Sequence, residues 1–312
     1  MEPLVLSIPS YEPLAARIAA ATGHPQGIVE RRTFADGEVY QRLETPVRGR
    51  DVILVAGTAT DADMLLAYDL ACAIVQWGAQ RLTWLVPYFG YMTMERAVRP
   101  GEVVTAKTRA ALMSAVPRSP QGNQVVLLDL HAPGIPHYFG DDVRAFHVYG
   151  KELVFESARA MAGSEADFVL AAPDAGRAKW VQSLANELGV DVALAYKRRV
   201  GDGKVRLTGV DAKVAGRVVV IYDDMVRTGS TLIEAAQAFR AAGAERVHAV
   251  CTHLVLPGDA LERLVGPGVL GGPPVLDGLA GTDSHPRALQ LAHEKLAVRS
   301  VDRLFASWLA HS

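Results

Sequence analysis

Cysteine is nearly absent from this sequence. Cys72 and Cys251 are the only two among 312 residues, and both lie in apolar stretches. This scarcity excludes a disulfide-rich scaffold and a cysteine-based metal site, and it is typical of proteins from a reducing compartment. The sequence also lacks a signal-peptide pattern at its start and any uncharged apolar run near the roughly 20 residues that span a bilayer. We therefore expect a soluble cytoplasmic protein without a membrane partner.

The net charge of the chain is also small. The 32 basic residues nearly balance the 34 acidic residues, and the formal net charge is −2. This balance gives no argument for a nucleic-acid partner or for an anionic membrane surface. Half of the residues are hydrophobic and 21% are charged, which is typical of globular proteins. The length is sufficient for two domains, each with its own core.

The most informative stretch is residues 216–232. The β-branched and aromatic run Val218–Tyr222 predicts a short buried strand, and Asp223 and Asp224 follow at its carboxyl end. A loop of small and polar residues then enters a helix predicted at Leu232–Ala241. The residues of this loop are Arg227, Thr228, Gly229, Ser230 and Thr231.

A strand, an acid pair and such a loop, in this order, indicate a pocket for a phosphorylated sugar. Ligands of open α/β sheets bind outside the carboxyl ends of the strands. A loop that enters a helix offers N–H groups, hydroxyls and the positive helix end to a phosphate. Two adjacent carboxylates suit the vicinal hydroxyls of a sugar, or a magnesium ion. The alternative is an ordinary strand–turn–helix, because these residues are also common in turns and at helix starts.

Strands alternate with helices along the chain, which predicts an α/β fold with mostly parallel sheets flanked by helices. The predicted strands are 4–8, 28–33, 51–56, 82–86, 124–128, 168–171, 192–195 and 218–222. The predicted helices are 12–21, 63–76, 105–114, 178–188, 232–241 and 302–310. Loops are predicted at 92–102 and 265–278, where glycine and proline are frequent.

One strand–helix unit occurs twice in the sequence. The unit from Gly49-Arg50 to Gly78-Ala79-Gln80-Arg81 returns from Gly216-Arg217 to Gly243-Ala244-Glu245-Arg246. The alternative is a chance likeness between two such units, but the shared Gly-Ala-x-Arg ending favours an internal repeat.

The repeat predicts two domains of like topology, residues 1–148 and 149–312, with the last helix (about 300–312) packing back on the first domain. The first copy has Ala56-Gly57-Thr58 where the second has the acid pair. We therefore expect the sugar chemistry in the second copy only.

One aspartate or histidine follows a predicted strand end in each half. Asp129-Leu130-His131 follows one strand, and Pro173-Asp174-Ala175-Gly176 follows another. A cleft between the halves would let His131 and Asp174 share one magnesium ion, although imidazole is an unusual ligand for so hard a cation. The alternative for His131 is a polar residue that bonds a backbone carbonyl.

Two further clusters carry chemistry. Lys197-Arg198-Arg199 ends a predicted strand and enters the polar residues 200–204, so this basic loop is suited to closing over a triphosphate. A solvated basic turn is the alternative. The turn Phe34-Ala35-Asp36-Gly37-Glu38 joins an aromatic ring to two carboxylates and could stack on a nucleobase, or it is a plain hairpin.

Together these motifs resemble the ribose-phosphate diphosphokinase (phosphoribosyl-pyrophosphate synthetase) family over nearly the whole chain. Simple phosphoribosyltransferases share only the loop of residues 223–231. The remaining matching pieces are residues 34–38, 47–51, 87–91, 105–107, 129–132, 173–176, 197–199 and 251–253.

The resemblance implies two similar phosphoribosyltransferase-like domains and one reaction. The 1-hydroxyl of ribose 5-phosphate attacks the β-phosphorus of ATP, and AMP leaves. Lys197 and Arg199 would stabilise the transferring diphosphoryl group, and Mg²⁺ would be bound through His131 and Asp174. Asp223 and Asp224 would hold the ribose hydroxyls, and the 5-phosphate would lie on residues 227–231.

The resemblance also implies a homo-oligomer, a hexamer or a smaller assembly, whose active site is shared between subunits. Phe34, Asp36, Gly37 and Glu38 would reach into the nucleotide site of a neighbouring subunit. The rest of that nucleotide site would come from Thr93, Met94 and Arg96.

The nucleotide segment departs from the family pattern. Thr93 and Met94 stand where the family usually has the arginine and glutamine that contact ATP. Arg227 stands where the family usually has aspartate, and residues 145–148 replace another family stretch. The departures at Thr93 and Met94 keep one alternative open: a non-catalytic homologue that binds the sugar phosphate or associates with an active synthetase. A third interpretation, an unusual phosphoribosyltransferase, is disfavoured because no separate base-binding segment stands out. Nucleotide preference and effectors do not follow from the sequence.

Overall fold

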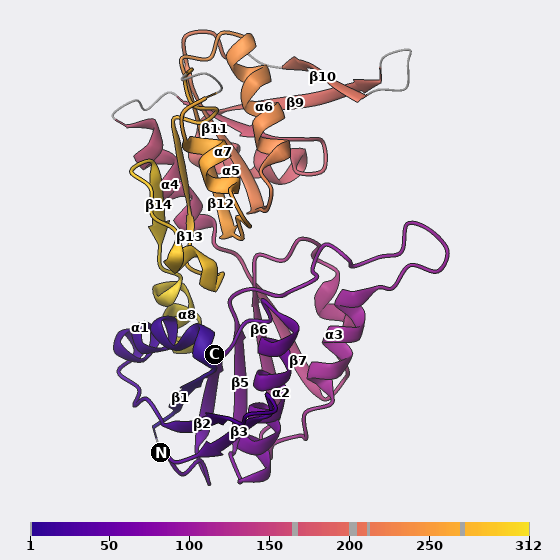
Figure 1. The fold of residues 1–312 in the computed structure, drawn as a ribbon, viewed down its shortest axis with the longest axis vertical. Helices are drawn as coiled ribbons and strands as arrows, with labels where there is room; N and C mark the ends of the chain where they lie inside the picture. The colour runs from indigo at the N-terminus through magenta and orange to yellow at the C-terminus, as the bar shows by residue number, and fades with distance from the viewer. Residues whose placement is uncertain (1, 164–167, 200–204, 211–212, 269–271, 312) are drawn as a thin grey trace. The chain divides into compact units, whose positions relative to one another are not determined.

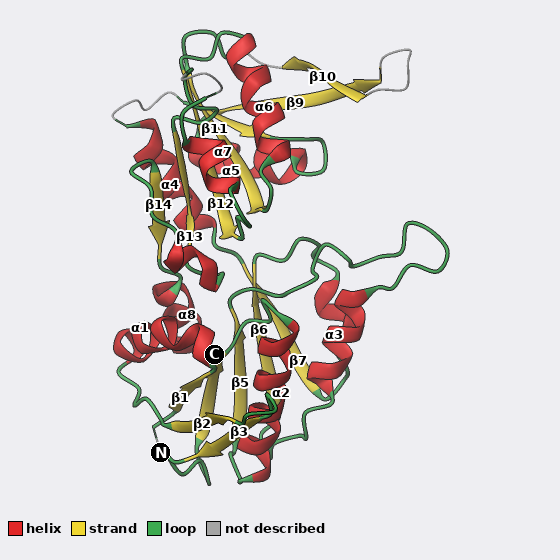
Figure 2. Cartoon of the chain, in the orientation of Figure 1, coloured by secondary structure: helices red, strands yellow, loops and turns green. Residues whose placement is uncertain are grey.

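The computed structural model describes residues 2–163, 168–199, 205–210, 213–268 and 272–311, with 196–199 and 205–210 described by their backbone alone. The chain divides into two compact units (Figures 1 and 2). The N-terminal unit comprises Met1–Tyr149, Ser284–Pro286 and Ser300–Ser312. The C-terminal unit comprises Gly150–Asp283 and Arg287–Arg299. Within the described residues, no helix is long and apolar enough to cross a membrane.

The N-terminal unit is built on a parallel sheet in the order β1-β4-β5-β6-β7, with a separate antiparallel hairpin, β2–β3. The strands are β1 (Leu4–Ser7), β2 (Val29–Thr33), β3 (Val39–Leu43), β4 (Asp51–Val55), β5 (Arg81–Val86), β6 (Asn123–Leu128) and β7 (Val143–Val148). The helices are η1 (Pro9–Tyr11), α1 (Glu12–Thr22), α2 (Asp61–Gln76), α3 (Thr105–Ser114), η2 (Ile135–Tyr138) and α8 (Asp302–Ala310). The last helix, α8, packs beside α1 (Figure 1).

The C-terminal unit is built on a sheet in the order β10-β9-β8-β11-β12-β13-β14, in which only the β9–β10 pair is antiparallel. The strands are β8 (Val169–Ala172), β9 (Asp191–Arg199), β10 (Val205–Val210), β11 (Val218–Val226), β12 (Arg246–Leu254), β13 (Gly278–Thr282) and β14 (Leu296–Arg299). The helices are α4 (Lys151–Ala162), α5 (Ala178–Leu188), α6 (Ser230–Ala241) and α7 (Ala260–Val265), followed by η4 (Pro286–Gln290).

Strand β11 shows why this sheet is buried on both faces. Successive side chains of a strand point to opposite faces. Val219 and Ile221 pack in one core cluster with residues of α6 and α7, whereas Val218, Val220 and Tyr222 pack in another with residues of α4 and α5. Helices therefore cover both faces, and the continuous apolar run of β11 is typical of a central parallel strand.

The repeated glycines of the two units make the same backbone contacts. The Gly49 N–H donates to the Gly78 carbonyl at 2.8 Å, and the Gly216 N–H donates to the Gly243 carbonyl at 2.8 Å. Gly49 and Gly216 both have a φ of 72°, in the left-handed region that glycine adopts without strain. The repeat in the sequence is therefore also a repeat in the backbone.

Helix predictions were accurate, and several strand predictions were too short. The bounds of α3, α5 and α8 agree with the predicted ranges. The strand predicted at 218–222 continues to Val226 because β11 keeps pairing with β12, and the strand predicted at 192–195 continues to Arg199 because β9 pairs with β10. The sequence analysis missed α4, α7, β7, β10, β13 and β14, and the end of the predicted loop 265–278 is buried at Leu276.

Candidate active site

The carboxyl ends of β8 and β11 meet at the centre of the C-terminal sheet. These strands are parallel neighbours, with Ile221 opposite Ala171. From β8 the chain proceeds to β9 on one side, whereas from β11 it proceeds to β12 on the other, so the strand order reverses between them. In open α/β sheets such a reversal opens the crevice in which ligands bind. Asp174, the acid pair and residues 227–231 all follow or end these two strands.

The acid pair lies within β11. The sequence analysis expected Asp223 and Asp224 beyond a strand end, whereas the strand runs two residues past Asp224 and pairs Asp223 with Cys251 of β12. Asp224 is 3% exposed and Asp223 is partly buried. The Asp224 N–H donates to the Asp223 Oδ1 at 2.9 Å, which fixes the first carboxylate against the backbone.

Arg177 contacts both carboxylates, and the sequence analysis missed it. Its Nη2 lies 2.5 Å from the Asp224 Oδ2, and its Nε lies 3.7 Å from the Asp223 Oδ1. Arg177 is the N-cap residue of α5, directly after the loop that follows β8. Its position in the sequence could have indicated this contact. Arg177 follows the loop after β8, and the carboxyl ends of parallel strands lie at the same edge of a sheet as the acid pair.

The electrostatics of the pair follow from burial and from this arginine. Burial and the negative charge of Asp224 raise the pKa of Asp223 well above its ordinary value, and Arg177 opposes that rise. Burial likewise raises the pKa of the Cys251 thiol well above its ordinary value, and both aspartates add to the rise. Cys251 is therefore a buried thiol with little thiolate character.

The loop after β11 presents an open helix start. Gly229, the N-cap residue of α6, has a φ of 77°, and a Cβ there would lie 2.9 Å from the Leu264 Cδ1, so glycine is required. Within the described residues, no side chain caps α6 and no acidic residue lies in its first turn. Arg227, Thr228 and Ser230 are exposed, so N–H groups, hydroxyls and a cation surround this helix end.

The corresponding helix start in the N-terminal unit is closed. Thr60 caps α2 by accepting the Asp63 N–H at 3.0 Å, and the first turn contains Asp61 and Asp63. Ser10 donates a further hydrogen bond to Asp63 at 2.8 Å. Negative charge and an occupied cap disfavour a phosphate here, which supports the expectation that sugar phosphate binds in the second copy only.

The predicted magnesium ligands belong to different units. Asp174 follows β8 in the C-terminal unit, is partly buried, and accepts the Gly176 N–H through Oδ1 at 2.9 Å. His131 follows β6 in the N-terminal unit and is partly buried, two residues after Asp129, which has a positive φ of 38°. No cluster of three or more potential metal ligands occurs among the described residues.

The predicted catalytic residues lie on the β9–β10 hairpin. Lys197 pairs with Leu207, and Arg199 pairs with Val205 at the last described position before residues 200–204. The sequence analysis placed both at the end of a strand, and the structure places them in the last three residues of β9. The loop predicted to close over a triphosphate, 200–204, lies outside the described residues.

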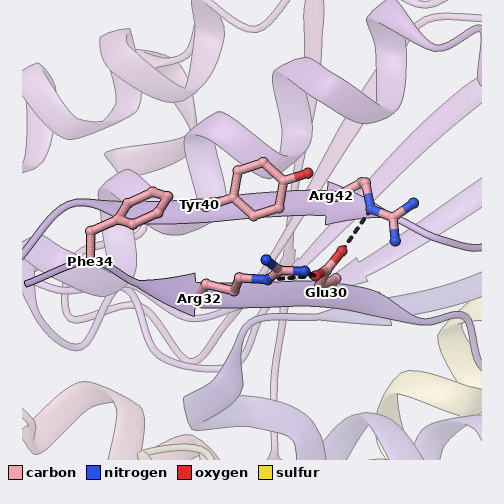
Figure 3. A pocket seen from close by; sticks show the side chains of 5 residues that line it. All are labelled: Glu30, Arg32, Phe34, Tyr40 and Arg42. Atoms are coloured by element: carbon pink, nitrogen blue, oxygen red, sulfur yellow. Dashed lines mark hydrogen bonds and ion pairs between the residues drawn. The ribbon is translucent and has the colours of Figure 1, made fainter.

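The predicted nucleobase turn is the tip of the β2–β3 hairpin. Phe34 is 53% exposed, and the Asp36 Oδ1 accepts the Glu38 N–H at 3.1 Å, with Gly37 at a φ of 93° between them. One hairpin face forms a surface pocket in which the Phe34 and Tyr40 rings lie beside a cross-strand ion cluster (Figure 3). In this cluster Glu30 bonds Arg32 and accepts from the Arg42 Nε at 2.7 Å.

The predicted nucleotide segment begins at a strained turn after β5. Tyr91 has a φ of 61°, its hydroxyl donates to Asp61 at 2.9 Å, and the Arg109 guanidinium lies 5.2 Å from its ring centroid. Arg109 also pairs with Asp61 at 2.7 Å. Beyond this turn Met94 is 44% exposed, and residues 93 and 96 are also at least partly exposed.

Two protein-family models match this chain. The model of the N-terminal domain of ribose phosphate pyrophosphokinase matches residues 4–116, and the model of the phosphoribosyl transferase domain matches residues 149–263. A curated ribose-phosphate pyrophosphokinase of Fusobacterium nucleatum is 31% identical over 94% of this chain and 90% of its own length. Another from Campylobacter jejuni is 32% identical over 88% of this chain and 84% of its own length.

A solved structure has the same fold as this chain and a name that agrees with the names of these relatives. The phosphoribosylpyrophosphate synthetase from Mycobacterium smegmatis superposes with a TM-score of 0.85 at 25% identity, covering 99% of this chain and 98% of that chain. The predicted α/β fold with two phosphoribosyltransferase-like domains is confirmed, as is the predicted transferase function. The chain belongs to the ribose-phosphate pyrophosphokinase family.

Proposed function

We propose that this chain transfers the diphosphoryl group of ATP to ribose 5-phosphate and forms phosphoribosyl pyrophosphate and AMP. The 1-oxygen of the sugar forms a bond to the β-phosphorus while the bond from the α,β-bridging oxygen to that phosphorus breaks. The 1-hydroxyl proton passes to solvent, and AMP keeps the bridging oxygen. The observation that carries the proposal is an acid pair and an uncapped helix start at one strand-order reversal.

The sugar phosphate binds entirely within the C-terminal unit. Asp223 and Asp224 accept hydrogen bonds from the ribose 2- and 3-hydroxyls through their carboxyl oxygens. The 5-phosphate lies at the start of α6, where backbone N–H groups and the side chains of residues 227–231 surround it. The arrangement fixes the sugar at both ends, so its 1-oxygen is oriented for attack.

Magnesium fits the donors that the chain provides. One oxygen of Asp174 already accepts a backbone N–H, so this residue offers a single further oxygen at the sheet edge. A site with few protein ligands suits an ion that keeps several waters and arrives with substrate phosphates. Asp174 and His131 are the proposed ligands. When bound, the ion would neutralise charge on the diphosphoryl group.

The remaining proposed roles concern the nucleotide. Lys197 and Arg199 stabilise the negative charge that develops during transfer, and the N-terminal unit binds ATP through the segment that holds Thr93, Met94 and Arg96. Phe34, Asp36 and Glu38 complete the nucleotide site of a second copy of the chain, which makes the active form a homo-oligomer. The exposure of Phe34 supports this role, since large exposed apolar side chains often mark contact surfaces.

The test is an assay with ribose 5-phosphate, Mg²⁺ and one nucleoside triphosphate at a time. We expect AMP and phosphoribosyl pyrophosphate in equal amounts from ATP, with no ADP. Release of ADP or of inorganic phosphate would overturn the proposal. Binding of ribose 5-phosphate without any release of nucleoside monophosphate would instead identify a non-catalytic homologue.

A further inference from the structure

We propose that Arg177 is a positioning residue, the built-in counter-cation of the acid pair, and that it reserves this pair for the sugar diol by excluding divalent cations. The inference rests on the proposed sugar site in the C-terminal unit. It assigns to Arg177 a role that no motif of the sequence indicated.

The contact is largely buried. The side chains of Arg177, Asp223 and Asp224 are 17%, 18% and 4% exposed, respectively. At 2.5 Å the Arg177 Nη2 and the Asp224 Oδ2 form a close ion pair, whereas the Arg177 Nε lies 3.7 Å from the Asp223 Oδ1. Low exposure weakens solvent screening, so the guanidinium contributes strongly to the local potential.

The helix start holds the guanidinium in place. The Arg177 carbonyl accepts the Val181 N–H at 3.0 Å and so opens α5, and the preceding loop is closed by the bond between Gly176 and Asp174. Arg177 therefore projects from a fixed point between β8 and α5, and its cation does not depend on a ligand to reach the acid pair. A guanidinium presented in this way orients the Asp224 carboxylate before the sugar arrives.

The charges decide which ligand the pair accepts. Two carboxyl groups and one guanidinium carry a net charge no more negative than −1, so a divalent cation gains little attraction here and is repelled by Arg177 at a distance of a few ångströms. A vicinal diol is neutral and needs only acceptor oxygens, which the carboxyl groups keep while they are paired with Arg177. Arg177 thus favours the diol and separates this site from the cation proposed at Asp174.

The test compares Arg177→Gln and Arg177→Lys with the wild type. Calorimetric titration with ribose 5-phosphate alone, without nucleotide or metal, measures the first effect. We expect Arg177→Gln to weaken binding at least tenfold, and Arg177→Lys to recover most of the loss because it restores the charge. The matched control is Arg217→Gln, which removes an arginine whose partner, Asp191, is 73% exposed, and which should leave binding unchanged.

The second readout uses Mn²⁺ as a probe, counted by electron paramagnetic resonance on the ligand-free protein. We expect Arg177→Gln to bind one more Mn²⁺ than the wild type, and the added change Asp224→Asn to abolish that gain. An unchanged Mn²⁺ count would overturn the inference, as would ribose 5-phosphate affinity within twofold of the wild type. If the wild type itself fails to bind ribose 5-phosphate, the proposed function fails, and the Mn²⁺ count still tests Arg177.

Discussion

Asp224 has a structural role in the sheet in addition to its proposed role in sugar binding. It is 3% exposed in the middle of the sheet and pairs with Arg177 at 2.5 Å. The sequence predicted a carboxylate beyond a strand end, where its loss would leave stability unchanged, but its place within β11 predicts two effects of one substitution.

Asp224→Asn should weaken ribose 5-phosphate binding and also destabilise the fold. The neutral amide loses a charge-assisted bond to Arg177, so the free energy of unfolding should fall by about 1.5–3 kcal/mol. Urea denaturation without ligand measures this fall, and calorimetric titration measures the binding. The control is Asp191→Asn on β9, an exposed partner of Arg217, which should lower stability by less than about 1 kcal/mol. Unchanged stability in Asp224→Asn would contradict the structural role.

His248 predicts how stability depends on pH. It is 7% exposed on β12, and neither ring nitrogen has a hydrogen-bond partner within the described residues. Burial lowers its pKa below the ordinary value of 6.5, with smaller effects of Arg246 and Arg240 in the same direction and an opposing effect of Asp277. The unfolded chain then binds this proton more readily than the folded chain does.

The sign of the pH effect follows from proton binding. The contribution of neutral His248 to the free energy of unfolding is complete above pH 6.5, the ordinary pKa of histidine. It is lost as the pH drops from that value through the lower pKa of His248 in the folded chain, because the unfolded state binds more protons in this window. His248→Gln should remove this part of the acid-induced loss. Urea denaturation at several pH values measures it, with the exposed His137→Gln as control. A pH profile identical to that of the wild type would contradict the assignment.

At the scale of elements, the bounds of a helix or strand could be predicted where a residue in the sequence marks its end. Helix α5 was predicted at its observed bounds because Gly189 ends it in the left-handed conformation that favours glycine. Strand β11 was predicted four residues too short because Asp223 and Asp224 break the apolar pattern while the backbone goes on pairing with β12. Local patterns fail at such places because polar residues proposed to bind a ligand do not follow the apolar pattern of a core strand.

The third prediction concerns Lys197 on the β9–β10 hairpin. Lys197 lies in the last three residues of β9, next to the residues predicted to close over the triphosphate. Its charge should act on the diphosphoryl group during transfer, so Lys197→Ala should lower kcat more than tenfold, at least about 1.4 kcal/mol. Ribose 5-phosphate affinity should stay within twofold. Steady-state kinetics and calorimetry measure the two, with the exposed Lys213→Ala as control. If the variant keeps more than a tenth of the wild-type kcat, Lys197 is not catalytic.

The fourth prediction concerns nucleotide binding by the segment after β5. Tyr91 is held in a left-handed conformation by Asp61 and Arg109, so the following turn keeps its path even though Thr93 and Met94 lack the charge and amide that would bind ATP. Losing an arginine–phosphate contact weakens binding by about 1.5–3 kcal/mol. The wild type should therefore show a high KM for ATP and poor discrimination against GTP.

Thr93→Arg combined with Met94→Gln should lower the KM for ATP at least tenfold and sharpen the preference for ATP, with the KM for ribose 5-phosphate unchanged. Initial rates with ATP and GTP measure both effects. The opposite result would be a wild type that already prefers ATP by roughly a hundredfold with tight binding. In that case another cation, such as Arg96, supplies the contact.

At the scale of the whole molecule, the two units repeat one order of elements. Each has a strand, a helix, an antiparallel hairpin and a strand–helix–strand unit, so β1-α1-β2-β3-β4-α2-β5 corresponds to β8-α5-β9-β10-β11-α6-β12. The two hairpins β2–β3 and β9–β10 correspond. The sequence revealed this repeat through its glycines, because they are needed at positive φ.

The order of strands could not be read from the sequence in the same way. The hairpin β9–β10 joins the main sheet beside β8, whereas β2–β3 forms a sheet of its own. Short apolar runs predict that a strand exists and do not say which neighbour it pairs with, since pairing depends on contacts distant in sequence. Arg177 was missed for the same reason, because only the pairing of β8 with β11 brings it to the acid pair.

The last prediction concerns α8, the helix with which the chain returns to the N-terminal unit. After the C-terminal unit, α8 packs on α1, with Phe305 fully buried and the Arg17 Nε donating to the Ser300 Oγ at 3.0 Å. Trp308 of α8 also contacts Phe146 of β7, with ring centroids 5.3 Å apart. The last residues of the chain thus complete the core of the N-terminal unit.

Phe305→Ala should therefore destabilise the N-terminal unit selectively, by about 3–5 kcal/mol, because truncating a buried aromatic side chain leaves a cavity. Hydrogen exchange followed by mass spectrometry resolves the effect by segment, and we expect lost protection in α1, β1 and β4 while β8, β11 and β12 keep theirs. The control is Arg303→Ala, an exposed position on the same helix that should change little. Equal loss of protection in both units would mean that they unfold as one cooperative body, and α8 would then stabilise the whole chain rather than the N-terminal unit alone.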